Sequence, residues 1–330
     1  MSRFAVTLAG LATVTAVLIC LSLLTGPAGT PAGAGLAALI SGGDGALGIV
    51  MREIRLPRAL LALLIGAGLG LSGAALQGYL RNPLAEPGLL GVSGTAALGA
   101  VLALYTGLSA AFPLALPLMA LAGAFLAVLL VQALAGSGGG SITLILAGIA
   151  VSSLAGALTA LALNLSPNPF AASEIVFWLL GSLADRSMPQ FWLAGPFIVA
   201  GMALLFTLGR ALDALTLGED AAASMGVTLA RTRMLAVIGT ALAVGAGVAV
   251  AGAIGFVGLV VPHVLRPLVG GMPSRLLPAS ALGGAALLLA ADLAVRVIAP
   301  DRDLKLGVLT ALVGAPFFLW LVWRHRRTLA

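Results

Sequence analysis

Residues 57–80 read PRALLALLIGAGLGLSGAALQGYL and carry no charge after Arg58. About 20 consecutive apolar residues are enough for an α-helix to cross the hydrocarbon core of a bilayer. Gly66 and Gly70 form a G-x-x-x-G pattern, which is typical of membrane helices that pack closely against a neighbour. Residues 57–80 therefore predict a membrane-spanning helix with one tightly packed face.

The composition extends this prediction to the whole chain. Of the 330 residues, 61% are apolar and 8% are charged, whereas soluble domains are about 45–50% apolar and about 25% charged. So little charge cannot cover the surface of a water-soluble protein of this size, which excludes a soluble globular fold. The net charge of +6 comes from scattered arginines and one lysine, Lys305. Since nucleic-acid-binding proteins cluster their cations, we expect no nucleic-acid partner.

Segments long enough to cross the membrane recur along the chain. Nine are predicted as spanning helices: residues 4–26, 57–80, 89–107, 113–135, 142–165, 191–209, 234–254, 276–299 and 306–323. A shorter tenth segment, residues 255–270, contains Pro262 and His263 and is also counted as a span. The chain is thus predicted to be an all-α, polytopic membrane protein with about ten transmembrane helices in a single domain, residues 1–330.

The first segment could instead be a secretory signal peptide. Arg3 precedes it, and Ala32-Gly33-Ala34 resembles a cleavage site. The apolar region of a signal peptide is about 7–15 residues long, whereas residues 4–26 run for 23 residues without a charge. We therefore expect this segment to be retained as a spanning helix.

The distribution of cations predicts the orientation in the membrane. Ten spans put both termini on the same side, and cytoplasmic termini place ten lysines and arginines inside and seven outside. Because cytoplasmic loops carry the excess of positive charge, both termini are predicted to be cytoplasmic. The outer set includes Arg55, Arg58 and Arg296. The outer face therefore carries more arginine than connecting loops without a function require.

Several chemistries are excluded by missing motifs. Lys305 follows Leu304, so the sequence has no G-x-x-x-x-G-K-[ST] phosphate loop and the chain is not predicted to hydrolyse ATP or to be an enzyme. No Cys/His grouping with metal-ligand spacing is present, so no metal site is predicted. The acid within a predicted span, Asp292, lies four residues before Arg296, a spacing that predicts a helical salt bridge.

Three polar stretches interrupt the apolar pattern. Arg55-Leu56-Pro57-Arg58 places two arginines on one face of a helix start. Residues 81–94 contain two Xaa-Pro pairs and three glycines, and such non-helical backbone must be buried in protein or line a cavity. In the loop 210–233, residues 217–226 predict a short helix that either packs on the membrane domain or docks into a partner.

In their order along the chain, these motifs resemble the membrane permeases of type II ABC importers, which carry iron-siderophore chelates, haem and vitamin B12. The resemblance runs from about Arg55 to the C-terminus. The matching segments are residues 55–58, 71–77, 82–93, 217–222, 255–263 and 314–320.

This resemblance implies a function and a set of partners. A ferric siderophore, or vitamin B12 or haem, would cross the bacterial inner membrane from periplasm to cytoplasm. The chain would pair with a second copy of itself, with two ATP-binding subunits on the cytoplasmic side and a substrate-binding protein on the periplasmic side. ATP and Mg²⁺ would be bound by the ATPase subunits, and no cofactor is expected in this chain.

The resemblance also assigns roles to particular residues. By similarity, Arg55, Arg58 and Arg296 would meet acidic residues of the binding protein, because opposite charges steer docking. The ATPase-coupling residues would be Leu217, Gly218, Glu219, Asp220, Ala221, Ala222 and Gly226. The cytoplasmic gate would be formed by Asn82, Leu84, Ser141, Ile142 and Thr143.

Two other classes of protein remain open. A secondary transporter driven by an ion gradient predicts intramembrane acids or unwound helices that hold the ion, whereas Asp292 lies beside Arg296. A membrane scaffold or receptor subunit that transports nothing predicts no dependence on an ATPase. Within the importer class, ferric siderophore is preferred only on the breadth of the family.

Overall fold

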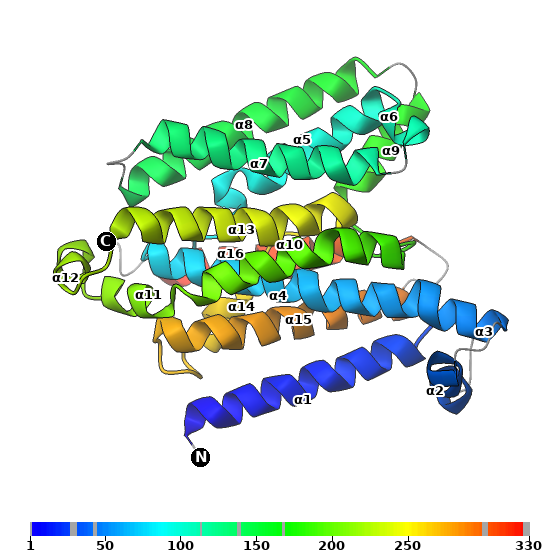
Figure 1. Cartoon of the computed structure of the whole chain (residues 1–330), viewed down its shortest axis with the longest axis horizontal. Helices are drawn as coiled ribbons and strands as arrows, with labels where there is room; N and C mark the ends of the chain where they lie inside the picture. The colour runs from blue at the N-terminus through cyan, green and yellow to red at the C-terminus, as the bar shows by residue number, and fades with distance from the viewer. Residues whose placement is uncertain are drawn as a thin grey trace.

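The computed structural model describes residues 2–26, 32–41, 45–112, 114–136, 140–166, 169–298 and 303–325. These residues form helices joined by turns, and no strand is found among them. The long helices run roughly side by side in one bundle (Figure 1). Among the described helices, eight are long and apolar enough to cross a membrane. The prediction of an all-α, polytopic membrane protein is therefore confirmed.

The helices differ widely in length. The long ones are α1 (Arg3–Leu24), α4 (Leu56–Tyr79), α7 (Ala115–Ala135), α8 (Ser141–Asn164), α10 (Met188–Phe206), α13 (Leu229–Ala251), α15 (Pro273–Ile298) and α16 (Leu306–His325). The short ones are α2 (Ala32–Ser41), α3 (Ala46–Ile49), α5 (Val92–Tyr105), α6 (Leu108–Ala111), α9 (Pro169–Leu179), α11 (Gly209–Leu215), α12 (Glu219–Ser224) and α14 (Val257–Leu265). A π-helical segment, η1 (Val50–Arg55), joins α3 to α4, and a single 3-10 turn, η2 (Pro87–Leu90), precedes α5.

Helix α4 is the packed centre of the bundle, in contact with α10, α13, α14 and α15. Its most extensive contact is with α15. A Cβ atom added to Gly66 would overlap the backbone of Gly284, and one added to Gly70 would overlap the backbone of Ser280. The prediction that the glycine pattern serves close helix packing is confirmed, because only a residue without a side chain permits this approach.

Two of the predicted spans contain unexpectedly short helices. Helix α5 has 14 residues and α14 has nine, or about 21 and 14 Å at 1.5 Å per residue, against a hydrocarbon core of about 30 Å. The rest of their apolar sequence lies in non-α segments inside the bundle: Pro87 and Leu90 are buried, and residues 252–256 separate α13 from α14. The count of ten spans therefore stays a prediction.

The two ends of the bundle carry different elements. The first residues of α1, the end of α16 and α12 lie at one end, and α2, α3, α6 and α9 lie at the other (Figure 1). The two termini of the described bundle therefore lie at the same end as α12. The cytoplasmic orientation of that end stays a prediction.

Candidate functional site

A buried ionic cluster lies at the end of the bundle that carries α2 and α3. Arg58 on α4 donates from Nε to both carboxylate oxygens of Asp292 on α15, at 2.9 and 3.1 Å, and its Nη2 lies 2.8 Å from Oδ1. Arg296 donates to Oδ2 of the same carboxylate, with Nε at 3.1 Å. The predicted Asp292–Arg296 salt bridge is confirmed, and the carboxylate is shared with a second arginine from another helix.

The same cluster holds the C-terminal end of α1. Arg296 Nη1 donates to the carbonyls of Ser22 and Thr25 at 2.9 and 3.0 Å, and Arg55 Nη1 donates to the carbonyl of Leu23 at 3.0 Å. The last carbonyls of a helix lack intrahelical partners and carry partial negative charge. The two guanidinium groups therefore cap α1 and tie it to α4 and α15.

This geometry gives the three predicted docking arginines a structural role. Arg55 is only 4% exposed, and the side chains of Arg296 and Arg58 are 8% and 17% exposed. Together with Asp292, these three arginines carry a net charge of +2, so the cluster itself is electropositive. The docking role stays a prediction, and Arg58 has the most side-chain surface to offer a partner.

The predicted coupling residues form a small helix at the opposite end. Helix α12 spans Glu219–Ser224, and Gly226 follows it with φ +86°, a left-handed conformation that suits glycine as a helix stop. Ala222 is fully buried, while Leu217 and Met225 are 69% and 64% exposed. The predicted short helix is thus confirmed: one face packs on the membrane domain through Ala222, and large apolar side chains flank the outward face.

The acidic residues of α12 lie close to the loop that follows α4. Arg81 Nη2 lies 3.9 Å from Glu219 Oε1, and both side chains are more than 40% exposed. Asp220 is exposed on the next position. An exposed pair at this distance contributes little to stability.

The predicted gate residues come from two segments. Asn82 Oδ1 accepts a hydrogen bond from the Leu84 N–H at 2.9 Å, which fixes the turn after α4. Ile142 and Thr143 are exposed in the first turn of α8, and the side chain of Ser141 lies outside the described part of the chain. The loop touches α8 deeper in the bundle, where a Cβ on Gly148 would overlap Leu89. The gate assignment stays a prediction.

Two motifs that lie 170 residues apart in the sequence meet inside the bundle. Glu86 Oε1 accepts a hydrogen bond from the Phe256 N–H at 2.6 Å. Phe256 has φ +66°, which is strained for a bulky residue, so the bond helps to hold the backbone at the start of α14. Burial raises the pKa of Glu86, and the hydrogen bond from Phe256 acts in the opposite direction.

Gln77 joins the same segments from α4. Its Nε2 donates to the carbonyls of Ala85 and Leu259, both at 3.4 Å, and its Oε1 accepts from Arg266 Nη2 at 2.8 Å. Beside it, a Cβ on Gly258 would lie 2.6 Å from Pro87 Cδ. The two interrupted segments, residues 81–91 and 252–258, are therefore locked together against α4.

The sequence interpretation missed these cross-helix contacts. The Arg58–Asp292 pair is separated by 234 positions and the Glu86–Phe256 bond by 170. Arg58, Glu86 and Asp292 stand out in the sequence as charged groups in apolar surroundings, whereas Phe256 does not. Spacing alone says nothing about which distant helix supplies the partner.

The fold and these features define a class of protein: a multi-pass membrane protein with non-α segments inside its bundle. Comparison with known proteins narrows the class. The family model described as the FecCD transport family matches residues 14–324. This chain belongs to the FecCD transport family.

Characterised relatives and a solved structure agree with that assignment. The chain is 43% identical to the Fe(3+) dicitrate transport system permease protein FecD of Escherichia coli (strain K12), over 84% of this chain and 86% of FecD. It is 41% identical to the cobalamin import system permease protein BtuC of Halobacterium salinarum, over 83% of this chain and 73% of BtuC. A solved structure described as an inward-facing, metal-chelate type ABC transporter is 34% identical, with a TM-score of 0.85 over 96% of this chain and 98% of that one.

Proposed function

We propose that this chain is the membrane permease through which an ABC importer carries a metal chelate from the periplasm into the cytoplasm. The observation that carries the proposal is the separation of its polar features: an electropositive arginine cluster at one end of the bundle and the exposed acidic helix α12 at the other. A permease of an ABC importer needs two such ends, one that accepts the substrate and one that contacts the ATP-binding subunits and transmits their motion. Membership of the FecCD transport family supports the same function.

The proposed assembly has two permease copies, two ATP-binding subunits and a periplasmic binding protein in the bacterial inner membrane. ATP and Mg²⁺ bind the ATP-binding subunits. Residues Leu217 to Gly226 transmit their motion, Arg55, Arg58 and Arg296 receive the binding protein, and the gate is formed by Asn82, Leu84, Ser141, Ile142 and Thr143. Leu217 and Met225 are exposed on either side of α12. Methionine and exposed apolar side chains are common at protein–protein interfaces, so these two residues support a protein contact there.

The cargo is a metal chelate, with ferric siderophore as the first choice and vitamin B12 or haem as the next. Relatives named for iron dicitrate and for cobalamin are almost equally identical to this chain, at 43% and 41%. Overall identity therefore does not distinguish between these cargoes. The cognate binding protein is the component that selects the chelate.

The test is ATP-dependent uptake into proteoliposomes that contain the permease and its ATP-binding subunits. Ferric siderophore, vitamin B12 and haem are offered one at a time through the cognate binding protein. The proposal predicts that one chelate accumulates only when ATP and the binding protein are both present. Accumulation driven by an ion gradient without ATP would contradict it.

An ion-coupled secondary transporter is the second candidate, and the ionic cluster argues against it. Such a transporter holds its ion with intramembrane acids or with unwound helices, and Asp292 is the acid that lies within a predicted span. Asp292 is fully buried and is bound by both Arg58 and Arg296. A carboxylate held by two guanidinium groups is poorly suited to exchange ions.

The docking role of Arg58 leads to a charge-reversal prediction. Arg58→Glu is expected to lower the affinity for the binding protein and the rate of uptake by about tenfold. Part of this loss has a structural cause, because a second carboxylate would face Asp292. Matched reversal of an acidic residue on the binding protein restores only the docking part, so partial rescue is the diagnostic result. An unchanged, salt-insensitive affinity would contradict the docking role.

A further inference from the structure

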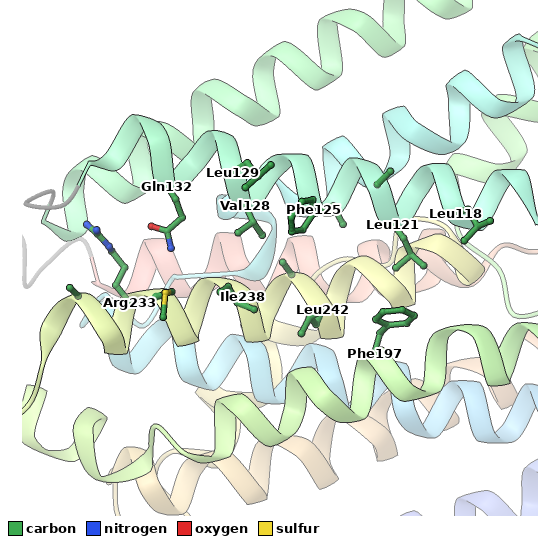
Figure 2. A pocket seen from close by; sticks show the side chains of 15 residues that line it. Leu118, Leu121, Phe125, Val128, Leu129, Gln132, Phe197, Arg233, Ile238 and Leu242 are labelled. Carbon is green, nitrogen blue, oxygen red and sulfur yellow. The ribbon is translucent and has the colours of Figure 1, made fainter.

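An apolar groove of about 840 Å³ lies between α7 and α13, with Phe197 of α10 at one end (Figure 2). Its walls consist of leucine, isoleucine, valine, alanine, methionine and phenylalanine side chains, apart from Gln132 and Arg233. Phe125 and Leu129 line it and are 63% and 51% exposed. The groove therefore opens sideways, toward the surroundings of the bundle.

The two polar residues lie together at one end of the groove, away from Phe197 (Figure 2). Arg233 Nη2 donates a hydrogen bond to the carbonyl of Gly136, directly after α7, at 2.6 Å. This bond fixes the guanidinium between the end of α7 and the start of α13. The groove consequently has one cationic end and an apolar remainder.

Positive charge is concentrated at this end by two further features. Arg231 is exposed two residues before Arg233. Helix α13 begins at Leu229, so the partial positive charge of its N-terminus lies at the same place. This end of α13 is also the end of the bundle that carries α12 (Figure 1).

The dimensions of the groove suit an acyl chain. From Leu118 to Gln132 it follows α7 for 14 residues, or about 21 Å at 1.5 Å per residue. One leaflet of a bilayer accounts for about 15 Å, half of the hydrocarbon core of about 30 Å. An acyl chain that begins beside Arg233 can therefore remain in the groove through its whole leaflet.

We propose that this groove binds an anionic phospholipid, with the phosphate beside Arg233 and an acyl chain along the apolar wall formed by α7 and α13. Charge complementarity selects the headgroup, because cationic pockets between membrane helices favour anionic lipids. A metal chelate fits this groove poorly, since the groove offers no polar group beyond its cationic end. The orientation in the proposed function places this lipid in the cytoplasmic leaflet, so that part of the proposal rests on the proposed function. The preference for an anionic headgroup does not depend on it.

The test is native mass spectrometry of the detergent-purified permease complex after addition of dioleoylphosphatidylglycerol or dioleoylphosphatidylcholine. We expect phosphatidylglycerol to be retained in preference to phosphatidylcholine. Arg233→Gln should lower that retention about fivefold, the effect of one cation near a headgroup, while Arg233→Lys should keep most of it. Ala122→Trp places an indole in the groove at an exposed lining position and should abolish retention.

The matched control is Ala16→Trp, the same change at an exposed alanine of α1, a helix that does not line the groove. It should retain phosphatidylglycerol as the unmodified complex does. If Arg233→Gln fails to fold, the Ala122→Trp and Ala16→Trp comparison decides the question. Equal retention of the two lipids, or retention unaffected by Ala122→Trp, would overturn the proposal without touching the proposed transport function.

Discussion

Asp292→Asn is expected to destabilise the permease by about 3–5 kcal/mol, the usual cost of removing one partner from a buried ion pair. Asp292 is fully buried and supplies the carboxylate that Arg58 and Arg296 both bind. Without its charge, two guanidinium groups repel each other inside the bundle, next to the end of α1. The measurement is the thermal unfolding midpoint of the detergent-purified protein, together with its amount in the membrane.

Asp303→Asn is the matched control for this prediction. Asp303 forms the other described aspartate–cation pair, with Lys305, but its side chain is 66% exposed. Exposed pairs contribute about 0–1 kcal/mol, so the control should unfold almost as the unmodified protein does. If Asp292→Asn is no more destabilising than Asp303→Asn, the cluster is not the structural link between α1, α4 and α15 described above.

The second large effect is expected at α12. The double substitution Glu219→Lys and Asp220→Lys should lower ATP-dependent uptake at least tenfold, because interfacial charges of this kind are worth about 2–5 kcal/mol when their partner remains buried. Both acids are exposed, and the ion pair between Glu219 and Arg81 is loose, at 3.9 Å. Membrane insertion and the unfolding midpoint should therefore be unchanged.

The diagnostic measurement is the ratio of ATP hydrolysed to chelate taken up in the same proteoliposomes. The α12 variant should raise this ratio, because hydrolysis is no longer transmitted to the membrane helices. Glu174→Lys reverses an exposed acid on α9, at the opposite end of the bundle, and should leave the ratio unchanged. A normal ratio in the α12 variant would remove the coupling assignment.

The spanning helices were well predicted from sequence because a bilayer imposes a simple requirement. Each segment of about 20 apolar residues has to form a helix that satisfies its own backbone hydrogen bonds. The same logic describes residues 89–107 and 255–270 less completely, because α5 and α14 have only 14 and nine residues. Some apolar residues next to these helices, such as Leu90 and Ile254, are buried outside the α-helices, and hydropathy does not distinguish burial by protein from burial by lipid.

The candidate site was predictable in part. Residues 81–94, 217–226 and the outer arginines were recognised because polar or helix-breaking residues are conspicuous in so apolar a chain. Their partners on other helices could not be predicted. Helical spacing assigns the Asp292 carboxylate to Arg296 but says nothing about Arg58, which lies on a different helix. The groove between α7 and α13 has no local signature at all, because its walls are ordinary apolar residues.

By itself, the sequence determined that this protein lies in a membrane and that it is helical. Those properties follow from composition and from local spacing. Only the tertiary structure decided that Arg58 and Arg296 share Asp292, that Arg55 and Arg296 bind the end of α1, that Glu86 holds the start of α14 and that Arg233 closes one end of a groove. These contacts join residues far apart in the chain, and only the packing of the helices against one another brings them within bonding distance.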